Sequence, residues 1–167
     1  IGLCNSALQL ADSLNLTDEG SIINIAEARW FRAFAYFDLV RNFGEVPLIT
    51  FKIYNPSDAQ VEKSGVEAIY AQIYEDLQFA EANLPVSWPD PKFIGRLTIG
   101  AAKSLHAKAL LYQKQWAQSL MLAEQVINSG QYQLFTPYWA LWKTQNENSV
   151  ESIFEVQAYQ SAGSAIN

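Results

Sequence analysis

The stretch that decides the fold is residues 21–43, which read SIINIAEARWFRAFAYFDLVRNF. Apolar side chains recur in it every three or four residues, which is the period of an α-helix. The main row comprises Ile23, Ala26, Trp30, Ala33, Phe37 and Val40, and a second row beside it comprises Phe31, Ala35 and Leu39. More than half of the circumference should therefore be buried, which predicts a central helix. Gly44 can cap its C-terminus, and Pro47 prevents the helix from continuing.

Four further segments repeat the same period, so we expect five helices in all. They run roughly over residues 1–14, 64–84, 99–113 and 116–128. Ser64 and Glu67 form the pattern of a capping box, in which the serine side chain accepts a hydrogen bond from the Glu67 amide at the start of the third helix. Pro85 ends that helix, and Thr98 is a suitable N-cap for the fourth.

The last two predicted helices form a hairpin that is similar to a tetratricopeptide repeat (TPR), with Lys114 in place of the usual turn glycine. The stripe that we expect the fifth helix to bury comprises Trp116, Leu120, Ala123 and Val126 or Ile127. The sequence therefore predicts an all-α fold, a TPR-like helical array or α-α superhelix, with long loops and at most a small β element. We interpret residues 1–167 as a single partial domain.

Two segments have the composition of strands. Residues 46–53 are β-prone, and residues 152–157, which read SIFEVQ, alternate between apolar and polar side chains. Two alternatives follow, since a lone strand needs a partner. Either the two segments pair with each other, or the partner of 152–157 lies outside this chain.

Composition excludes several classes of protein. The net charge is −6, with 11 basic and 17 acidic residues and no basic run, so the chain lacks the cations that nucleic acids or anionic lipids require. One cysteine and one histidine cannot form a structural zinc site or a disulfide framework. No apolar run reaches the roughly 18 residues that would cross a bilayer. We expect no metal, no cofactor and no transmembrane segment in this chain. Cys4 fits a helix face better than a lipoprotein processing site.

Four motifs together resemble the SusD/RagB family. The first is EARWFRAFAYFDLV at 27–40, followed by NFGEVPLI at 42–49, which is similar to the family's EAR helix and its FG-x-VPL ending. The others are IYEDLQFAEANLP at 73–85, GRLTIGAAK at 95–103 and NSVESIFEV at 148–156, in which Val150 is an insertion. The motifs keep the family's order along nearly the whole chain, so the chain is identified as an internal fragment of such a protein.

The resemblance implies a function and a location. Members are lipid-anchored nutrient-binding proteins at the surface of the outer membrane, and they cap a TonB-dependent, SusC-like transporter. It implies that the full-length parent binds an oligosaccharide or another nutrient and that this segment is mainly the helical scaffold facing the transporter. Much of the glycan site would lie in segments outside this chain, so the chain alone should bind glycans weakly or not at all.

Aromatic side chains are the groups that a sugar binder needs, because a pyranose can stack its C–H face on them. Trp88, in a proline-rich loop, is the best candidate by expected exposure, followed by Tyr138, Trp139 and Trp142. The alternative for each is packing in the core or at an interface. Trp142, Ile153, Phe154 or Val156 should be exposed, or buried only against a second copy of the chain, if their natural partner segment is absent.

No set of residues predicts catalysis. His106 is the single histidine and lies mid-helix, where it is a poor candidate for a triad, and no glycine-rich phosphate loop is present. We therefore expect a protein that is not an enzyme and has no catalytic residues. Two alternatives are a generic TPR-type protein-interaction module and an α-helical glycosidase.

Charged residues in the apolar central helix need partners. Three of them, Glu27, Arg29 and Arg32, occupy two successive turns of this helix. We expect ion pairs that connect this helix to its neighbours, because a buried charge is costly unless it is paired. The alternative is that the two arginines bind a ligand.

Overall fold

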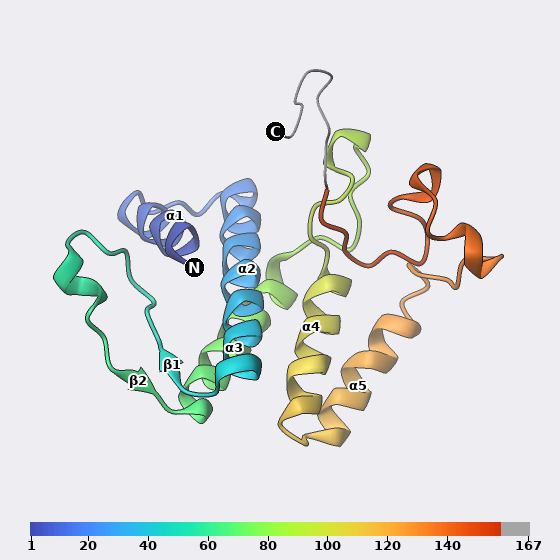
Figure 1. The fold of residues 1–167 in the computed structure, drawn as a ribbon. Coiled ribbons are helices and arrows are strands. Elements are labelled where there is room, and N and C mark those ends of the chain that lie inside the picture. Colours follow the sequence, from blue (N-terminus) through green and yellow to red (C-terminus); the bar gives the residue numbers. More distant parts are fainter. Residues whose placement is uncertain (158–167) are drawn as a thin grey trace, which may run out of the picture.

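The structure is a computed structural model that describes residues 1–157, in which five α-helices stack side by side in chain order (Figure 1). They are α1 (Gly2–Ser13), α2 (Glu19–Phe43), α3 (Val66–Asn83), α4 (Ile99–Tyr112) and α5 (Trp116–Ile127). Each helix packs mainly against the one before it and the one after it. The predicted all-α array of five helices is confirmed, with helix ends within two residues of expectation at both ends of α1 and α2.

Helix α2 is central, as predicted. The Asp18 side chain caps its start by accepting a hydrogen bond from the Ser21 amide at 3.0 Å. It ends where the Gly44 amide donates to the Val40 carbonyl, and Gly44 has a positive φ of 69° that suits glycine. The main core is built by α2, α3 and α4 around this helix. Its largest fully buried apolar side chains are Tyr36, Ile69, Ile73, Leu77 and Leu97.

The two predicted strand segments do not pair. Within the described residues the sheet is one short antiparallel ladder between β1 (Val46–Pro47) and β2 (Lys63–Ser64), with Val46 opposite Ser64. The predicted capping box is wrong, because Ser64 is extended in this ladder and α3 begins after Gly65 without a side-chain cap. Residues 152–157 form no ladder within the described residues, where Phe154 packs on Trp30, so the alternative that their partner lies outside this chain stays a prediction.

The predicted buried face of α5 is wrong for three of its residues and right for Val126, which is buried. Trp116, Leu120 and Ile127 are 58%, 59% and 73% exposed. The residues that face α4 are Ser119, Leu122 and Val126. Small Ser119 lets α5 approach α4 closely enough for its hydroxyl to donate to the Ala107 carbonyl at 2.8 Å. Two apolar faces lie side by side on this helix, and the helical period alone does not say which of them meets α4.

Two long segments, the loop between α3 and α4 and the chain after α5, meet at one end of the α4–α5 hairpin. The loop between α3 and α4 contains a 3₁₀ turn at Pro91–Phe93, and the segment after α5 contains 3₁₀ turns at Tyr138–Ala140 and Thr144–Asn146. Figure 1 shows the first loop in light green and the second segment in orange to red, both above α4 and α5. Four of the sequence-predicted aromatic residues lie in these two segments.

Candidate functional site

An ion pair is buried between α2 and α3, next to a hollow in the protein surface that is described below. The Arg32 guanidinium donates to both carboxylate oxygens of Asp76, at 2.8 and 2.7 Å, and to the Asn5 side-chain oxygen at 3.1 Å. Burial lowers the pKa of Arg32, but the hydrogen bonds and charge of Asp76 outweigh it, so the pKa is raised and the arginine stays charged. The expectation that the charges of α2 are paired is confirmed here.

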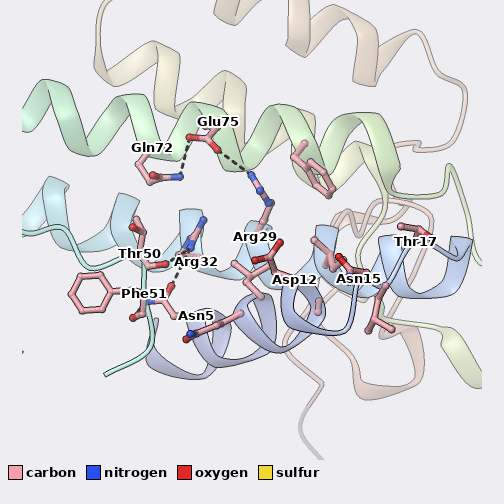
Figure 2. A pocket seen from close by; sticks show the side chains of 16 residues that line it. Asn5, Asp12, Asn15, Thr17, Arg29, Arg32, Thr50, Phe51, Gln72 and Glu75 are labelled. Atoms are coloured by element: carbon pink, nitrogen blue, oxygen red, sulfur yellow. Dashed lines mark hydrogen bonds and ion pairs between the residues drawn. The ribbon is translucent and has the colours of Figure 1, made fainter. Parts of the chain in front are cut away.

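Beside this ion pair lies a polar hollow of about 630 Å³ between α1, α2 and α3 (Figure 2). Figure 2 shows Gln72 and Glu75 on α3 across from Asn5 and Asp12 on α1, with Arg29 between the two helices. Arg29 donates to Glu75 at 3.2 Å, and its guanidinium carbon lies 4.4 Å from the centre of the Phe79 ring.

The arginines of the polar hollow are already matched by carboxylates, which disfavours the binding of an anion there. Arg29 is within 4 Å of both Glu75 and Asp76, and Arg32 is bonded to Asp76. The rest of its polar lining includes the uncharged side chains of Gln72 and Asn15 and the carboxylate of Asp12. The sequence predicted an ion pair for Arg29, with ligand binding by the two arginines as the alternative, but it did not reveal the hollow around Arg29.

A second candidate region is a cluster of exposed aromatic side chains after α5. Tyr138, Trp139 and Trp142 are 69%, 64% and 73% exposed. The rings of Tyr138 and Trp142 meet edge to face at 6.1 Å, and the Lys143 ammonium lies 4.3 Å from the Trp139 ring centre. Trp142 lines a hollow of about 540 Å³, which we call the Trp142 hollow. Its other walls are Leu141, Lys143, Thr144, Glu147 and residues 151–155.

Trp88 occupies a separate place. It is half-buried, and its indole N–H donates to the Leu97 carbonyl at 2.9 Å. The Arg96 guanidinium lies 4.3 Å from the Trp88 ring centre and is itself bonded to Glu27 at 2.7 Å. Trp88 lines a smaller hollow of about 180 Å³, and residues 152–155 contribute to both this hollow and the Trp142 hollow. The structure thus brings the rings of Tyr138 and Trp142 together, with Trp139 beside Lys143 in the same segment, and sets Trp88 apart from them.

Residues 148–157 are fastened to the helices by specific contacts. Phe154 lies 5.0 Å from the Trp30 ring, and Ile153 packs against the same core. The Glu155 carboxylate accepts from the Asn148 amide at 3.0 Å. Of the residues that we expected to be exposed, Val156 is 82% exposed and Trp142 is 73% exposed. Ile153 and Phe154 are partly buried.

Gly100 of α4 is expected to tolerate no side chain. A Cβ atom at this position would overlap the ring of Tyr132, whose hydroxyl is hydrogen-bonded to the Thr98 hydroxyl at 2.9 Å. Gly100→Ala should therefore lower the free energy of unfolding by roughly 1–3 kcal/mol, as overpacking does, despite the better helix propensity of alanine. Urea denaturation measures this. Gly2→Ala, where no atom lies within 4 Å, is the matched control. A stabilised Gly100→Ala variant would contradict the close packing of Tyr132.

His106, which the sequence made a poor candidate for catalysis, packs inside the helical array. His106 is buried on α4, with its Nδ1 atom 2.6 Å from a Glu81 carboxylate oxygen and its ring 5.3 Å from that of Tyr74. Among residues 1–157, no three His, Cys, Asp or Glu side chains gather as metal ligands would. No helix in that range has both the length and the hydropathy of a membrane span.

Comparison with known proteins agrees with the resemblance seen in the motifs. A SusD-like protein of Bacteroides ovatus is 34% identical over 145 residues, which are 80% of this chain and 26% of the relative. The starch-binding protein SusD of Bacteroides thetaiotaomicron is 30% identical over 147 residues, 84% of this chain and 25% of that protein. A solved structure, described as a laminarin-binding SusD-like protein, superimposes with a TM-score of 0.82 at 32% identity, over 90% of this chain and 34% of that one.

The chain spans about a quarter of the length of the curated relatives that it matches. Residues 1–111 match the SusD-like family described as starch-binding and associating with the outer membrane. The match includes α1 to α3 and nearly all of α4, which are the helices that carry the EAR and GR-x-T motifs. On this match and on the shared helical fold, the chain belongs to the SusD-like family.

Proposed function

We propose that this chain is the helical part of a glycan-binding protein and that it contributes sugar contacts through the Trp142 hollow. The observation that carries the proposal is the cluster of exposed Tyr138, Trp139 and Trp142 beside a hollow, in a chain of this family. The names of two similar proteins support the ligand class, since one is a starch-binding protein and the other binds laminarin.

The chemistry of the Trp142 hollow suits a neutral sugar. An indole ring gives a flat apolar face on which the C–H face of a pyranose can stack, and polar groups around such a face fix its orientation. Lys143 can donate to a hydroxyl, and Thr144 and Glu147 can accept from one. Glu151 and Glu155 already accept backbone hydrogen bonds, so their main contribution is to hold the wall in place. Trp88 is proposed as a second, weaker contact.

We further propose that the whole protein is the glycan-binding subunit of an outer-membrane uptake system, lipid-anchored at the cell surface beside a TonB-dependent transporter. In it, the helices of this chain are the scaffold that faces the transporter, and the sugar is bound and passed on unchanged rather than cleaved. The family description, which names the outer membrane, supports the location. The rigid core of α2, α3 and α4 suits a scaffold.

A TPR-type protein-interaction module is the second candidate, and one observation favours it. Such a module needs a concave surface with polar side chains, and the polar hollow between α1, α2 and α3 provides one, lined by Gln72, Glu75 and Arg29. A peptide ligand would contact this hollow and leave the Trp142 hollow unchanged.

Titration with sugars, followed by NMR of the tryptophan indole N–H signals, tests the glycan proposal. Suitable probes are maltoheptaose and laminarihexaose, which represent starch and laminarin. We expect weak saturable binding, with a Kd of roughly a millimolar, because one hollow offers few convergent groups. The indole signals of Trp142 and Trp139 should shift. Trp116 is the internal control, since it is similarly exposed but lies on α5.

Substitution sharpens this test. Trp142→Ala should weaken binding at least tenfold, equivalent to about 1.4 kcal/mol, and Trp88→Ala should weaken it less. If Trp116 shifts as much as Trp142, the sugar stacks on any exposed indole and the Trp142 hollow is not a site. If a sugar shifts only groups around Arg29, the polar hollow is the binding site instead.

A further inference from the structure

The lining of the Trp142 hollow has an excess of negative charge. Its charged groups are one ammonium and three carboxylates, which belong to Lys143, Glu147, Glu151 and Glu155. The Lys143 ammonium lies 4.3 Å from the centre of the Trp139 ring, so its charge interacts with that ring. The ion pairs formed within residues 1–157 involve other carboxylates, and none includes these three glutamates. A ligand in this hollow therefore meets a negative potential.

Two of the three carboxylates are held in place by backbone hydrogen bonds. Glu151 accepts from the Phe135 amide at 2.7 Å, and Glu155 accepts from the Asn148 amide at 3.0 Å. Each bond occupies one oxygen, and the second oxygen of either carboxylate has no hydrogen bond in the part of the chain that the structure describes. Both side chains are partly buried, so solvent screens them less than it screens exposed charges. These carboxylates cannot turn away from a ligand without breaking the bonds that hold them.

The neighbouring Trp88 hollow supplies no cation that would offset this charge. It shares residues 152–155 with the Trp142 hollow, and its lining includes Arg96. The Arg96 guanidinium donates to both carboxylate oxygens of Glu27, at 3.0 and 2.7 Å, so its charge is already matched. Of the described residues that line the two hollows, only Lys143 is a cation without a carboxylate partner.

We propose that Glu147, Glu151 and Glu155 determine the specificity of the Trp142 hollow by excluding acidic glycans. The ligand class is then neutral oligosaccharides, and sugars that carry uronate or sulfate groups are rejected. A sugar hydroxyl can donate to a carboxylate oxygen, so a neutral sugar is favoured at this lining. An anionic group would be placed beside like charges, which opposes its binding. This inference rests on the proposed glycan-binding function and deepens it.

A matched pair of sugars tests the exclusion. The probes are maltoheptaose and the same oligosaccharide with its C6 hydroxymethyl groups oxidised to carboxylates, and binding is followed by the indole N–H signal of Trp142. At an ionic strength of about 0.1 M, kept equal in both titrations, the oxidised sugar should bind at least roughly fivefold more weakly. At about 1 M the Debye length falls from about 10 Å to about 3 Å, so the two affinities should agree within about twofold.

Substitution of the glutamates identifies the cause of any preference. A variant with Glu147→Gln, Glu151→Gln and Glu155→Gln keeps the shape of each side chain, and the amide oxygens can still accept the two backbone hydrogen bonds. Lys143 is then the remaining charge among the described lining residues, so the oxidised sugar should bind at least as tightly as maltoheptaose. Glu124→Gln is the matched control, since Glu124 is exposed on α5 and outside the lining, and it should keep the preference of the unmodified chain.

A single substitution guards against misfolding of the triple variant. Glu147 is exposed, and its side chain has no hydrogen bond within residues 1–157, so Glu147→Gln should fold like the unmodified chain. This variant should bind the oxidised sugar roughly twofold more tightly and leave the affinity for maltoheptaose unchanged.

The outcomes separate this inference from the glycan proposal. A preference for maltoheptaose that shrinks with salt and disappears in the glutamine variants supports the exclusion of acidic glycans. Equal affinities for the two sugars at about 0.1 M would overturn the exclusion and leave the glycan proposal standing. A preference that neither salt nor the glutamine variants change would show that the hollow selects by shape, which also overturns the exclusion. If neither sugar shifts the Trp142 signal, the glycan proposal itself fails, and the exclusion fails with it.

Discussion

Replacing Arg32 with methionine is expected to lower the free energy of unfolding by about 3–5 kcal/mol, because it leaves a buried carboxylate without its partner. The side chain of Asp76 is fully buried and that of Arg32 is 6% exposed, so water cannot replace the lost guanidinium. The change would also remove the donor to Asn5, whose amide holds the carbonyls of Ile49 and Phe51. Urea denaturation followed by circular dichroism measures the loss.

An exposed ion pair provides the control. Arg41 donates to Asp38 at 2.6 Å, but the aspartate side chain is 60% exposed, so Arg41→Met should cost less than about 1 kcal/mol. Combining Arg32→Met with Asp76→Leu should recover part of the loss, because an apolar pair leaves no buried charge. Equal stability of the Arg32→Met and Arg41→Met variants would mean that the Asp76 carboxylate reaches solvent.

The helices could be predicted from sequence because their signals are local. The period of the apolar side chains over 21–43 and the capping residues Gly44 and Thr98 act over a few residues. The same sequence says that Arg32 needs a partner but does not identify it, since Asp76 is 44 residues away. The errors have the same origin. Ser64 fits the pattern of a capping box but pairs with Val46, and residues 152–157 do not pair with 46–53 because Phe154 packs on Trp30.

The candidate site was predictable in composition but not in geometry. Aromatics in irregular segments favoured Tyr138, Trp139 and Trp142; the rings of Tyr138 and Trp142 are in contact and Trp142 lines a hollow, while binding by these residues stays a prediction. Trp88 lies apart from these residues. Its position depends on its hydrogen bond to the Leu97 carbonyl and on the Arg96–Glu27 ion pair, which joins residues 69 positions apart in the sequence. The polar hollow depends on the packing of α1 against α2 and on the loop at Thr50, so no single stretch of sequence predicts it.

Two tryptophans on the helical array should respond very differently to the same substitution. Trp30 is 3% exposed and stacks on Phe34 at 5.3 Å, so Trp30→Ala should lower the free energy of unfolding by about 3–5 kcal/mol. Trp116 is 58% exposed in this chain, so Trp116→Ala should cost less than about 1 kcal/mol. Sequence periodicity alone assigns Trp116 to the core, and its exposure in the structure reverses that expectation. Urea denaturation of the two variants makes the comparison.

Trp30→Ala should also act on the proposed sugar site, which Trp116→Ala should not. Trp30 contacts Phe154, and residues 152–155 form a wall of the Trp142 hollow. Loosening that wall should reduce the sugar-induced shift of the Trp142 indole signal. The shift is measured without urea, where most molecules of the variant are folded. Trp30→Phe keeps an aromatic ring beside Phe154 and should preserve most of that shift if full truncation unfolds the chain. A Trp30→Ala variant that is folded and shows an unchanged Trp142 response would mean that the wall holds its shape without the Trp30–Phe154 contact.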